Sequence, residues 1–421
     1  MIDSNLKRYQ TYQKSELNWL GEVPAIWKLN RHKDNFSFIA DRCVNPILTK
    51  VGLENIESKT GRFIETDSEF DGDGVHFKIN DLLFGKLRPY LAKVYLAGFE
   101  GNAVGDIFVY RTKKSISPRF ANFLMLSDRY IDVINSSTAG AKMPRVSSGF
   151  IANLAIDVPS KHEQNEIVSY LDNKTAKIDH QINLLTQKAE HYKKLKQSLI
   201  NKSVTLGLEK AVAMKDSGID WIGNVPVNWN IQRIGTAFEE RSEKVNDTDY
   251  PPLSVSMGGI VPQMESVAKT DHNENRKRVA VGDYVINSRS DRRGASGISI
   301  YDGSVSVINI VLKPKKKFYG KYLHHLFRSY RFIEEFYRNG RGIVDDLWTT
   351  RSAVMKTIEF AFPEFAEQKA IADYLDEKIP KIDQIVTTIN AQVEKLRELR
   401  KTLINDVVTG KIKVTDEGLA A

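Results

Sequence analysis

The stretch Thr175–Thr205, TAKIDHQINLLTQKAEHYKKLKQSLINKSVT, occurs twice in this chain. It returns as Ile379–Thr409, IPKIDQIVTTINAQVEKLRELRKTLINDVVT, at an offset of 204 residues (379 − 175). The match begins upstream, because Glu163-Gln164 and Tyr170-Leu171-Asp172 recur as Glu367-Gln368 and Tyr374-Leu375-Asp376. The chain therefore contains an internal duplication, and this repeated segment is its framework.

Each copy carries apolar residues at a spacing of seven. Such a pattern predicts a long helix with a coiled-coil seam, and two equal helices in one chain can cover each other as an antiparallel pair. Two ordinary amphipathic helices buried in separate domains are the alternative. We expect a break in each helix near Ala176 and its counterpart Pro380, since proline is tolerated only in a first turn. The expected seam is Ile178, Leu185, Tyr192, Leu195 and Leu199 with Ile382, Ile385, Ile389, Leu396, Leu399 and Leu403.

The composition indicates a folded chain with an anionic partner. With 421 residues, two or three domains are expected, and 41% of the residues are hydrophobic. No apolar run reaches the roughly 18 residues that a membrane span needs, no signal-peptide core is evident, and Cys43 is the only cysteine. We therefore expect a cytoplasmic protein without disulfides. The net charge of +8 favours nucleic acid among the anionic partners.

A second repeat precedes each long segment. Trp19-Leu20-Gly21-Glu22-Val23-Pro24-Ala25-Ile26-Trp27 returns 202 residues later as Trp221 to Trp229. Two tryptophans around Gly and Pro predict a turn fixed to a core by its aromatic rings, rather than a surface that stacks bases. We call each copy a turn motif. Between turn motif and long helix lie regions of short β-rich runs, one helical run (Pro118–Ile134 and Tyr319–Tyr337) and a final strand ending at Pro159 or Pro363.

Catalytic and metal-binding signatures are missing from the sequence. It has no phosphate-binding P-loop and no glycine-rich cofactor turn. His162-Glu163 lacks the second histidine of a zinc helix, and His324-His325 point in different directions on a predicted helix. We expect no catalytic residues, no metal site and no cofactor in this chain.

Basic loops stand at equivalent places in the two β-rich regions. In the first region they hold Lys86, Arg88 and Tyr90, then Lys142 and Arg145; in the second they hold Ser288, Arg289, Arg292 and Arg293, then Arg341 and Arg351. Arg276, Lys277 and Arg278 add to the basic character of the second region. Arginine can donate two hydrogen bonds to guanine, and lysine or arginine can pair with phosphate. The alternative for each loop is a solvated charged surface.

These features together resemble the specificity subunit of type I restriction-modification systems. The resemblance covers about residues 14–412 and is carried by the doubled Glu-Gln…Tyr-Leu-Asp…Lys-Ile-Asp helices ending in Leu-Ile-Asn, the two turn motifs, and Leu-Phe-Gly-Lys-Leu-Arg-Pro-Tyr at 83–90. In the second region the loop 288–294 matches by position more than by residue identity.

The resemblance implies an α+β chain with two α/β target-recognition domains, separated by two long antiparallel coiled-coil helices. The expected boundaries are 1–160 for the first recognition domain, 161–208 for the first helical region, 209–363 for the linker and second recognition domain, 364–412 for the second helical region and 413–421 for the tail. Each domain would read one half of a split double-stranded DNA target.

The resemblance also implies partners. Two methyltransferase subunits carrying S-adenosylmethionine would dock on the apolar and mixed outer faces of the long helices, with the Glu163 and Glu367 regions at their starts, and restriction subunits using ATP and Mg would join them. The chain itself would be non-catalytic. Two other functions remain open on the residues alone: a self-sufficient DNA-modifying enzyme, which methyl transfer by the purified chain would reveal, and a coiled-coil scaffold for proteins, which sequence-selective DNA binding would exclude.

Overall fold

The structure is a computed structural model that describes residues 8–14, 21–43, 48–67, 70, 73–140, 142–209, 211–263, 275–342 and 348–414. Trp19 and Leu20 of the first turn motif and most of the tail fall outside these residues. The chain divides into two compact units, the first made of residues 1–186 and 391–421 and the second of residues 187–390. Each unit thus holds one β-rich region and a part of both long helices.

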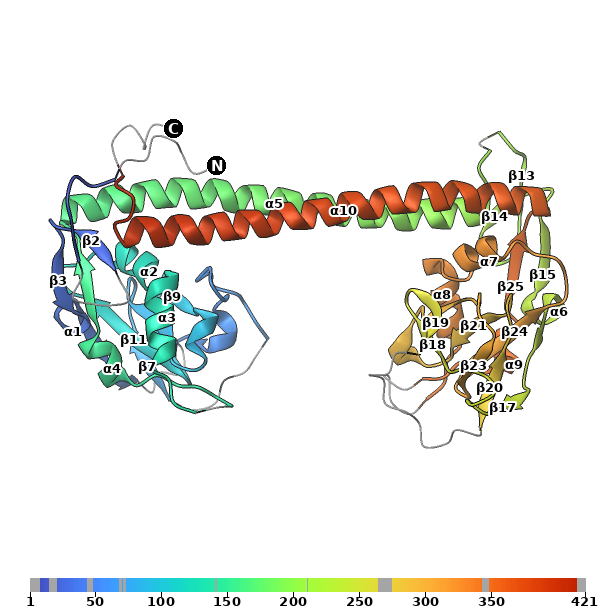
Figure 1. Cartoon of the computed structure of the whole chain (residues 1–421), viewed down its shortest axis with the longest axis horizontal. Coiled ribbons are helices and arrows are strands. Elements are labelled where there is room, and N and C mark those ends of the chain that lie inside the picture. The colour runs from blue at the N-terminus through green and yellow to red at the C-terminus, as the bar shows by residue number, and fades with distance from the viewer. Residues whose placement is uncertain are drawn as a thin grey trace. The chain divides into compact units, whose positions relative to one another are not determined.

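The repeated segments form two long, continuous helices, α5 (Lys161–Leu206) and α10 (Phe365–Val408), which lie side by side in Figure 1. The predicted break is wrong, because α10 passes through Pro380 without interruption. A proline inside a helix costs about 3 kcal/mol. Leu375 and Ile382 are buried on either side of it and hold the helix in place. The antiparallel coiled-coil pair itself is confirmed.

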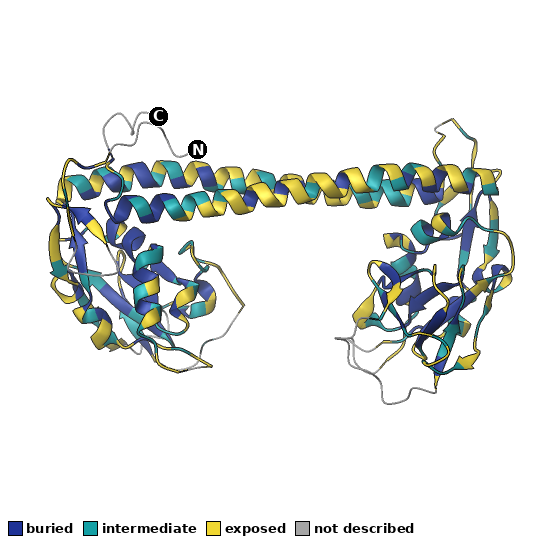
Figure 2. Ribbon diagram, in the orientation of Figure 1, coloured by how far each residue is buried: buried dark blue, intermediate teal, exposed yellow. Residues whose placement is uncertain are grey.

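The seam between the helices has a regular alternation of three and four residues. Residues of low exposure follow this spacing in both copies, whereas most residues between them are exposed (Figure 2). Leu195 and Ile385, predicted in the seam, are 52% and 37% exposed and lie beside it. The seam passes instead through the next positions, Lys196 and Val386, and in the same way through Arg400 next to the predicted Leu399, which is partly buried. The members of the seam are Ile178, Ile182, Leu185, Ala189, Tyr192, Lys196, Leu199, Ile382, Val386, Ile389, Val393, Leu396, Arg400 and Leu403.

Equivalent ion pairs cross the seam in each unit. In the first unit Arg400 Nε lies 3.1 Å from Asp179 Oδ1, and in the second Lys196 Nζ lies 2.7 Å from Asp383 Oδ2. The repeated Lys-Ile-Asp triplet thus places an apolar residue in the seam and a carboxylate at its edge. These polar pairs explain why apolar residues alone did not locate the seam. They also fix the register, since a shifted pair would leave a cation without its carboxylate.

The two ion pairs should differ in their contribution to stability. Asp179 and Arg400 are only 20% and 13% exposed, and Arg62 also pairs with Asp179 at 2.7 Å. Burial lowers the pKa of Arg400, and the Asp179 carboxylate opposes this shift. We expect Asp179→Ala to cost between the ~1 kcal/mol of an exposed pair and the ~3 kcal/mol of a buried one. The matched Asp383→Ala should cost less than ~1 kcal/mol. Urea denaturation measures both, and equal losses would contradict this ranking.

The two β-rich regions share one plan. In each, a four-stranded antiparallel sheet is covered by a helix pair, with the strands β4-β11-β8-β9 in the first region and β16-β24-β21-β22 in the second. The helical run predicted as one piece is two helices in both copies. Ser127 separates the two helices of the first copy, whereas in the second copy the first helix ends at Leu326 and Ser329 caps the next one. Figure 2 shows the central strands as buried.

The elements of the first region are β1 (Tyr12–Lys14), β2 (Glu22–Pro24), β3 (Lys28–Arg31), α1 (His32–Asn35), β4 (Phe36–Ile39), β5 (Arg42–Cys43), β6 (Lys50–Val51), η1 (Leu53–Asn55), β7 (Gly74–Phe77), β8 (Leu82–Gly85), η2 (Pro89–Leu91), β9 (Val94–Leu96), β10 (Gly101–Ala103), β11 (Ile107–Thr112), α2 (Pro118–Leu126), α3 (Asp128–Ser136), α4 (Ser148–Asn153) and β12 (Ala155–Val158).

The elements of the second region are β13 (Met214–Asp216), β14 (Asn224–Pro226), β15 (Asn230–Arg233), α6 (Ile234–Ala237), β16 (Phe238–Glu240), β17 (Lys244–Val245), β18 (Leu253–Ser256), β19 (Gly259–Pro262), β20 (Arg276–Val279), β21 (Tyr284–Asn287), η3 (Ser290–Arg292), β22 (Ser296–Ile298), β23 (Gly303–Ser306), β24 (Asn309–Pro314), α7 (Gly320–Leu326), α8 (Tyr330–Arg338), α9 (Ser352–Met355) and β25 (Glu359–Phe362).

The turn motifs anchor the β-rich regions to the start of the helices. Trp27 Nε1 donates to Glu163 at 3.1 Å, and Trp229 Nε1 donates to Glu367 at 3.2 Å. Gln164 accepts a hydrogen bond from the Ser117 backbone at 2.8 Å and donates to Pro159 O at 3.0 Å. Gln368 makes the same two kinds of bond in the second unit. The repeated Glu-Gln pair therefore joins the helix start to the domain that precedes it.

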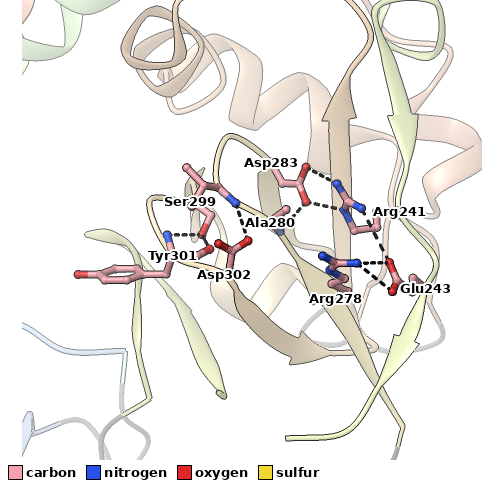
Figure 3. A network of polar contacts seen from close by, with 9 residues as sticks. Arg241, Glu243, Arg278, Ala280, Asp283, Ser299, Tyr301 and Asp302 are labelled. Carbon is pink, nitrogen blue, oxygen red and sulfur yellow. Dashed lines mark hydrogen bonds and ion pairs between the residues drawn. The ribbon is translucent and has the colours of Figure 1, made fainter. Parts of the chain in front are cut away.

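An aspartate at the beginning of β8 and β21 forms a buried clamp. Asp283 accepts two hydrogen bonds from Arg241 and one from the backbone of Ala280 (Figure 3). Asp81 accepts equivalent bonds from Arg111 and from the Lys78 backbone. Because the arginine comes from a different strand in each copy, the sequence repeat does not show the clamp.

A buried histidine makes the first unit sensitive to acid. His32 is 1% exposed and stacks on Phe36 with ring centroids 4.1 Å apart. Burial lowers its pKa to about 3, so below pH 6.5 the unfolded chain binds a proton that the folded chain excludes. Stability is therefore lost as the pH falls from 6.5 toward 3. We expect the fall in unfolding free energy between pH 7.5 and 5 to be about 2 kcal/mol smaller in His32→Phe. Urea denaturation at the two pH values measures this difference, and an equal fall in unfolding free energy in the variant and the wild type would contradict the prediction.

Candidate functional site

In the first unit the two predicted basic loops lie against each other. The Arg88 N–H donates to Pro144 O at 2.8 Å, and the Val146 N–H donates to Lys86 O at 3.1 Å. Arg145 also forms isolated β-bridges with Leu87 and with Ala139. Three segments, 85–88, 139 and 144–146, therefore form one junction, which we call the first reading junction.

Asp106, which the sequence did not single out, lies at the centre of this junction. Its carboxylate accepts a hydrogen bond from Arg145 Nη2 at 2.9 Å and lies 3.5 Å from Lys86 Nζ. The Arg145 side chain is still 56% exposed, so its remaining N–H groups face solvent. A guanidinium carries five N–H donors in a fixed plane. Asp106 therefore orients Arg145 while leaving donors available for a ligand.

The other predicted residues of the first junction lie at its surface. Arg88 adopts a left-handed backbone conformation with φ of 49° and is exposed. Tyr90 is 47% exposed in η2, and Lys142 is exposed in the following loop. Ala141 lies outside the described residues. One carboxylate, several cations and an aromatic ring thus gather at one end of the β4-β11-β8-β9 sheet.

The second unit repeats the junction with other residues. Thr349 forms isolated β-bridges with Arg289 and with Arg341, and the Thr350 N–H donates to Ser288 O at 2.9 Å. Arg289, Arg341 and Thr349 correspond to Leu87, Ala139 and Arg145 by the repeat offsets of 202 and 204. We call this arrangement the second reading junction. The first junction carries its arginine on the middle segment, whereas the second junction carries an arginine on each of the two outer segments.

The remaining predicted site residues of the second unit fall into two groups. Arg351 and Ser288 line a hollow of about 470 Å³ beside Arg289 and Thr349, and Arg292 is exposed. Arg293, in contrast, pairs with Glu334 at 2.9 Å and lies over the Tyr337 ring. Arg293 therefore contacts α8 and does not point to the junction hollow.

The basic strand β20 is engaged within the protein. Arg276 is 6% exposed and donates to Ser304 Oγ and O. Lys277 Nζ donates to Asn309 O at 2.9 Å, and Arg278 pairs with Glu243 at 3.1 Å (Figure 3). The basic character of residues 276–278 thus reflects internal contacts.

Among the described residues, no group of three or more His, Cys, Asp or Glu side chains is placed to hold a metal ion. Within the same residues, no helix combines the length and the apolar character required to cross a membrane.

Comparison with known proteins supports the arrangement. Residues 10–187 match the family model of the type I restriction modification DNA specificity domain. The MjaVIII specificity subunit of a type I restriction enzyme from Methanocaldococcus jannaschii is 23% identical and aligns over 93% of this chain and 94% of its own length. The EcoDI specificity subunit from Escherichia coli is 26% identical over 35% of each chain.

Solved structures give the same fold over nearly the whole chain. A protein from a structural study of complex assembly and conformational transition in a type I R-M system has a TM-score of 0.71 at 16% identity, covering 92% of this chain and 98% of that one. The HsdS subunit from Thermoanaerobacter tengcongensis has a TM-score of 0.50 at 17% identity, with the same coverage. Residues 10–187 therefore carry a type I restriction modification DNA specificity domain, and the chain as a whole is similar to the specificity subunits of type I restriction enzymes.

Proposed function

We propose that each reading junction recognises one half of a bipartite double-stranded DNA target. The observation that carries this proposal is the repeated three-segment junction. The same backbone scaffold occurs in both units, but its cations stand at different positions. A shared scaffold with different side chains suits two modules that perform the same task on different sequences. The recognition domains would comprise residues 1–160 and 209–363.

The chemistry of the junctions fits direct readout of bases. Arg145, Arg289 and Arg341 can each present two parallel N–H groups to the N7 and O6 atoms of guanine in the major groove. Lys86, Arg88 and Lys142 are suited to phosphates, which position a protein without reading sequence. Asp106 orients the Arg145 guanidinium. A fixed orientation suits the two directed hydrogen bonds of a base contact, whereas a contact to phosphate needs only the charge.

The helix pair would set the distance between the two half-sites. Each helix passes from one unit into the other without a break. A continuous helix advances about 1.5 Å per residue, so the number of residues between the two ion pairs determines the length of the spacer.

Partner subunits would supply the chemistry of the complex. Two methyltransferase subunits with S-adenosylmethionine would modify adenines, and ATP-dependent restriction subunits, using Mg, would join them. The present chain would contribute specificity and no catalytic residue. The Glu163 and Glu367 carboxylates, expected near the docking surface, are bound to Trp27 and Trp229, so they are better placed to hold the domains than to bind a partner.

A flank of α5 is the better docking surface for a methyltransferase subunit. Leu184 and Leu195 are 50% and 52% exposed, and eleven residues, about three helical turns, place them on one side. Lys188 and His191 lie between them and are exposed. We expect Leu195→Glu to reduce co-purification of the methyltransferase subunit at least tenfold, since it buries a charge. Gln197→Glu, on the opposite flank, is the control, and an equal effect would exclude this surface.

The proposal is tested by co-expressing the chain with a methyltransferase subunit and sequencing host DNA for methylated adenines. The expected result is a motif of two short blocks around a fixed gap, present only when this chain is present. An undivided motif, or methylation that does not change when the chain is deleted, would contradict the proposal.

A further inference from the structure

The two-residue turn between β23 and β24 exposes apolar side chains next to the second reading junction. Val307 is 43% exposed and Ile308 is 40% exposed. Branched aliphatic residues are unusual at the tip of a tight turn, where Gly, Asn and Asp are preferred. The turn therefore presents apolar surface at a place where a polar sequence would be expected.

The turn is part of the wall of the junction hollow. Val307, Ile308 and Asn309 line the hollow of about 470 Å³ together with Arg289, Thr349 and Arg351. The backbone of the turn is fixed from two sides, because Ser288 Oγ donates to Ile308 O and Lys277 Nζ donates to Asn309 O. The turn is thus held against the loop that follows β21, and its side chains are the apolar part of this surface.

The equivalent turn of the first unit also contacts its junction. Asp106 corresponds to Ile308 by the offset of 202, and it binds Lys86 and Arg145. The Lys86 N–H donates to Asp106 O at 2.9 Å. Both units therefore use the same turn as a third component of the junction, beside the two basic loops. The turn is charged in one unit and apolar in the other.

We propose that the Val307–Ile308 turn is a specificity-determining element that contacts the C5-methyl group of a thymine in the second half-site. This inference rests on the proposed function and adds an element of the site to it. In the major groove the methyl group is the one apolar feature that distinguishes thymine from the other bases. An apolar side chain among arginines that position phosphates and guanines is suited to that group.

The half-site read by the second unit must contain at least one A·T pair, because only such a pair presents a methyl group. Arg289 and Arg341, on either side of Thr349, would contact the neighbouring positions. A second half-site composed only of G·C pairs would overturn the inference.

The test uses the assembled complex with its methyltransferase subunits and oligonucleotides that carry the motif found by sequencing. Each thymine of the second half-site is replaced in turn by deoxyuridine, which lacks only the methyl group. At one position the wild-type complex should bind about fourfold more weakly, the loss that removal of one buried methyl group brings. The Val307→Ala, Ile308→Ala double variant should bind thymine and deoxyuridine at that position equally.

Val281→Ala is the matched control. Val281 is a branched residue of the same unit that is 60% exposed, but it precedes β21, whereas the reading loop follows that strand. Its substitution should leave the fourfold ratio unchanged. The inference is overturned if no deoxyuridine position weakens wild-type binding, or if the double variant weakens binding equally to thymine and to all other sequences. A wild-type complex without any sequence preference would instead overturn the proposed function.

Discussion

Replacing Arg145 by Ala should abolish discrimination at one base pair of the first half-site and leave the second half-site intact. Arg145 projects from the middle segment of the first junction and keeps most of its N–H groups exposed while Asp106 holds one of them. Loss of one good base contact costs about 1–3 kcal/mol, which corresponds to roughly 5- to 150-fold in relative affinity. Binding of the reconstituted complex to a set of oligonucleotides, each with one base pair changed, measures it.

Two further variants distinguish the recognition of bases from the binding of phosphates. Lys86→Ala should weaken binding to all sequences alike, because a phosphate contact carries no sequence information. The slope of the logarithm of the binding constant against the logarithm of the salt concentration should become smaller by about one, the value for one lost phosphate contact. Lys114→Ala removes an exposed cation beyond the far end of β11 from Asp106 and should change neither property. A uniform loss for Arg145→Ala, like that of Lys86→Ala, would show that Arg145 holds a phosphate.

Inserting four residues into both helices should lengthen the spacer of the target while both half-sites stay unchanged. The insertion points are between residues 186 and 187 and between 390 and 391, where the chain passes from one unit to the other. One extra turn adds about 6 Å and about 40° of rotation. B-DNA advances about 3.4 Å and turns about 35° per base pair. The methylated motif should therefore gain one or two base pairs in its gap, because a coiled coil absorbs a four-residue insertion by local unwinding.

The same insertion in α5 alone should disrupt methylation. The pairs Arg400–Asp179 and Lys196–Asp383 cannot both form when one helix is longer by a turn. Sequencing of host DNA distinguishes the two variants. If the double insertion leaves the gap unchanged, the helices do not set the spacer.

The framework could be predicted from the sequence because it is repeated. The doubled helices, the turn motifs and the antiparallel pairing all follow from residues that recur at fixed offsets. Pro380 was misleading, since local proline chemistry predicts a break that buried Leu375 and Ile382 override. Leu195 and Leu399 were misassigned because the true seam continues through the polar neighbours Lys196 and Arg400, and Ile385 was misassigned because the seam continues through Val386.

The reading junctions were only partly predictable. Loop position indicated Arg145 and Arg289, but no sequence pattern links Leu87, Ala139 and Arg145, which meet only in the folded chain. Asp106 and the Val307–Ile308 turn lie outside the basic runs, so a search for cations passes over them. Arg293 was predicted as a DNA-binding residue from its place in a basic loop, but its guanidinium contacts Glu334 and Tyr337 within the protein. Charge in a loop thus indicates a region of contact and not the individual residues.

The central claim is that each unit reads its own half of the target. It is tested most directly by replacing the second recognition domain with a copy of the first, joined at the equivalent turn motifs and final strands, and sequencing methylated adenines in cells that also contain the methyltransferase subunit. The account predicts a motif with the first half-site on both sides of the gap and no trace of the second. Persistence of the original second half-site in the motif of this chimera would contradict it.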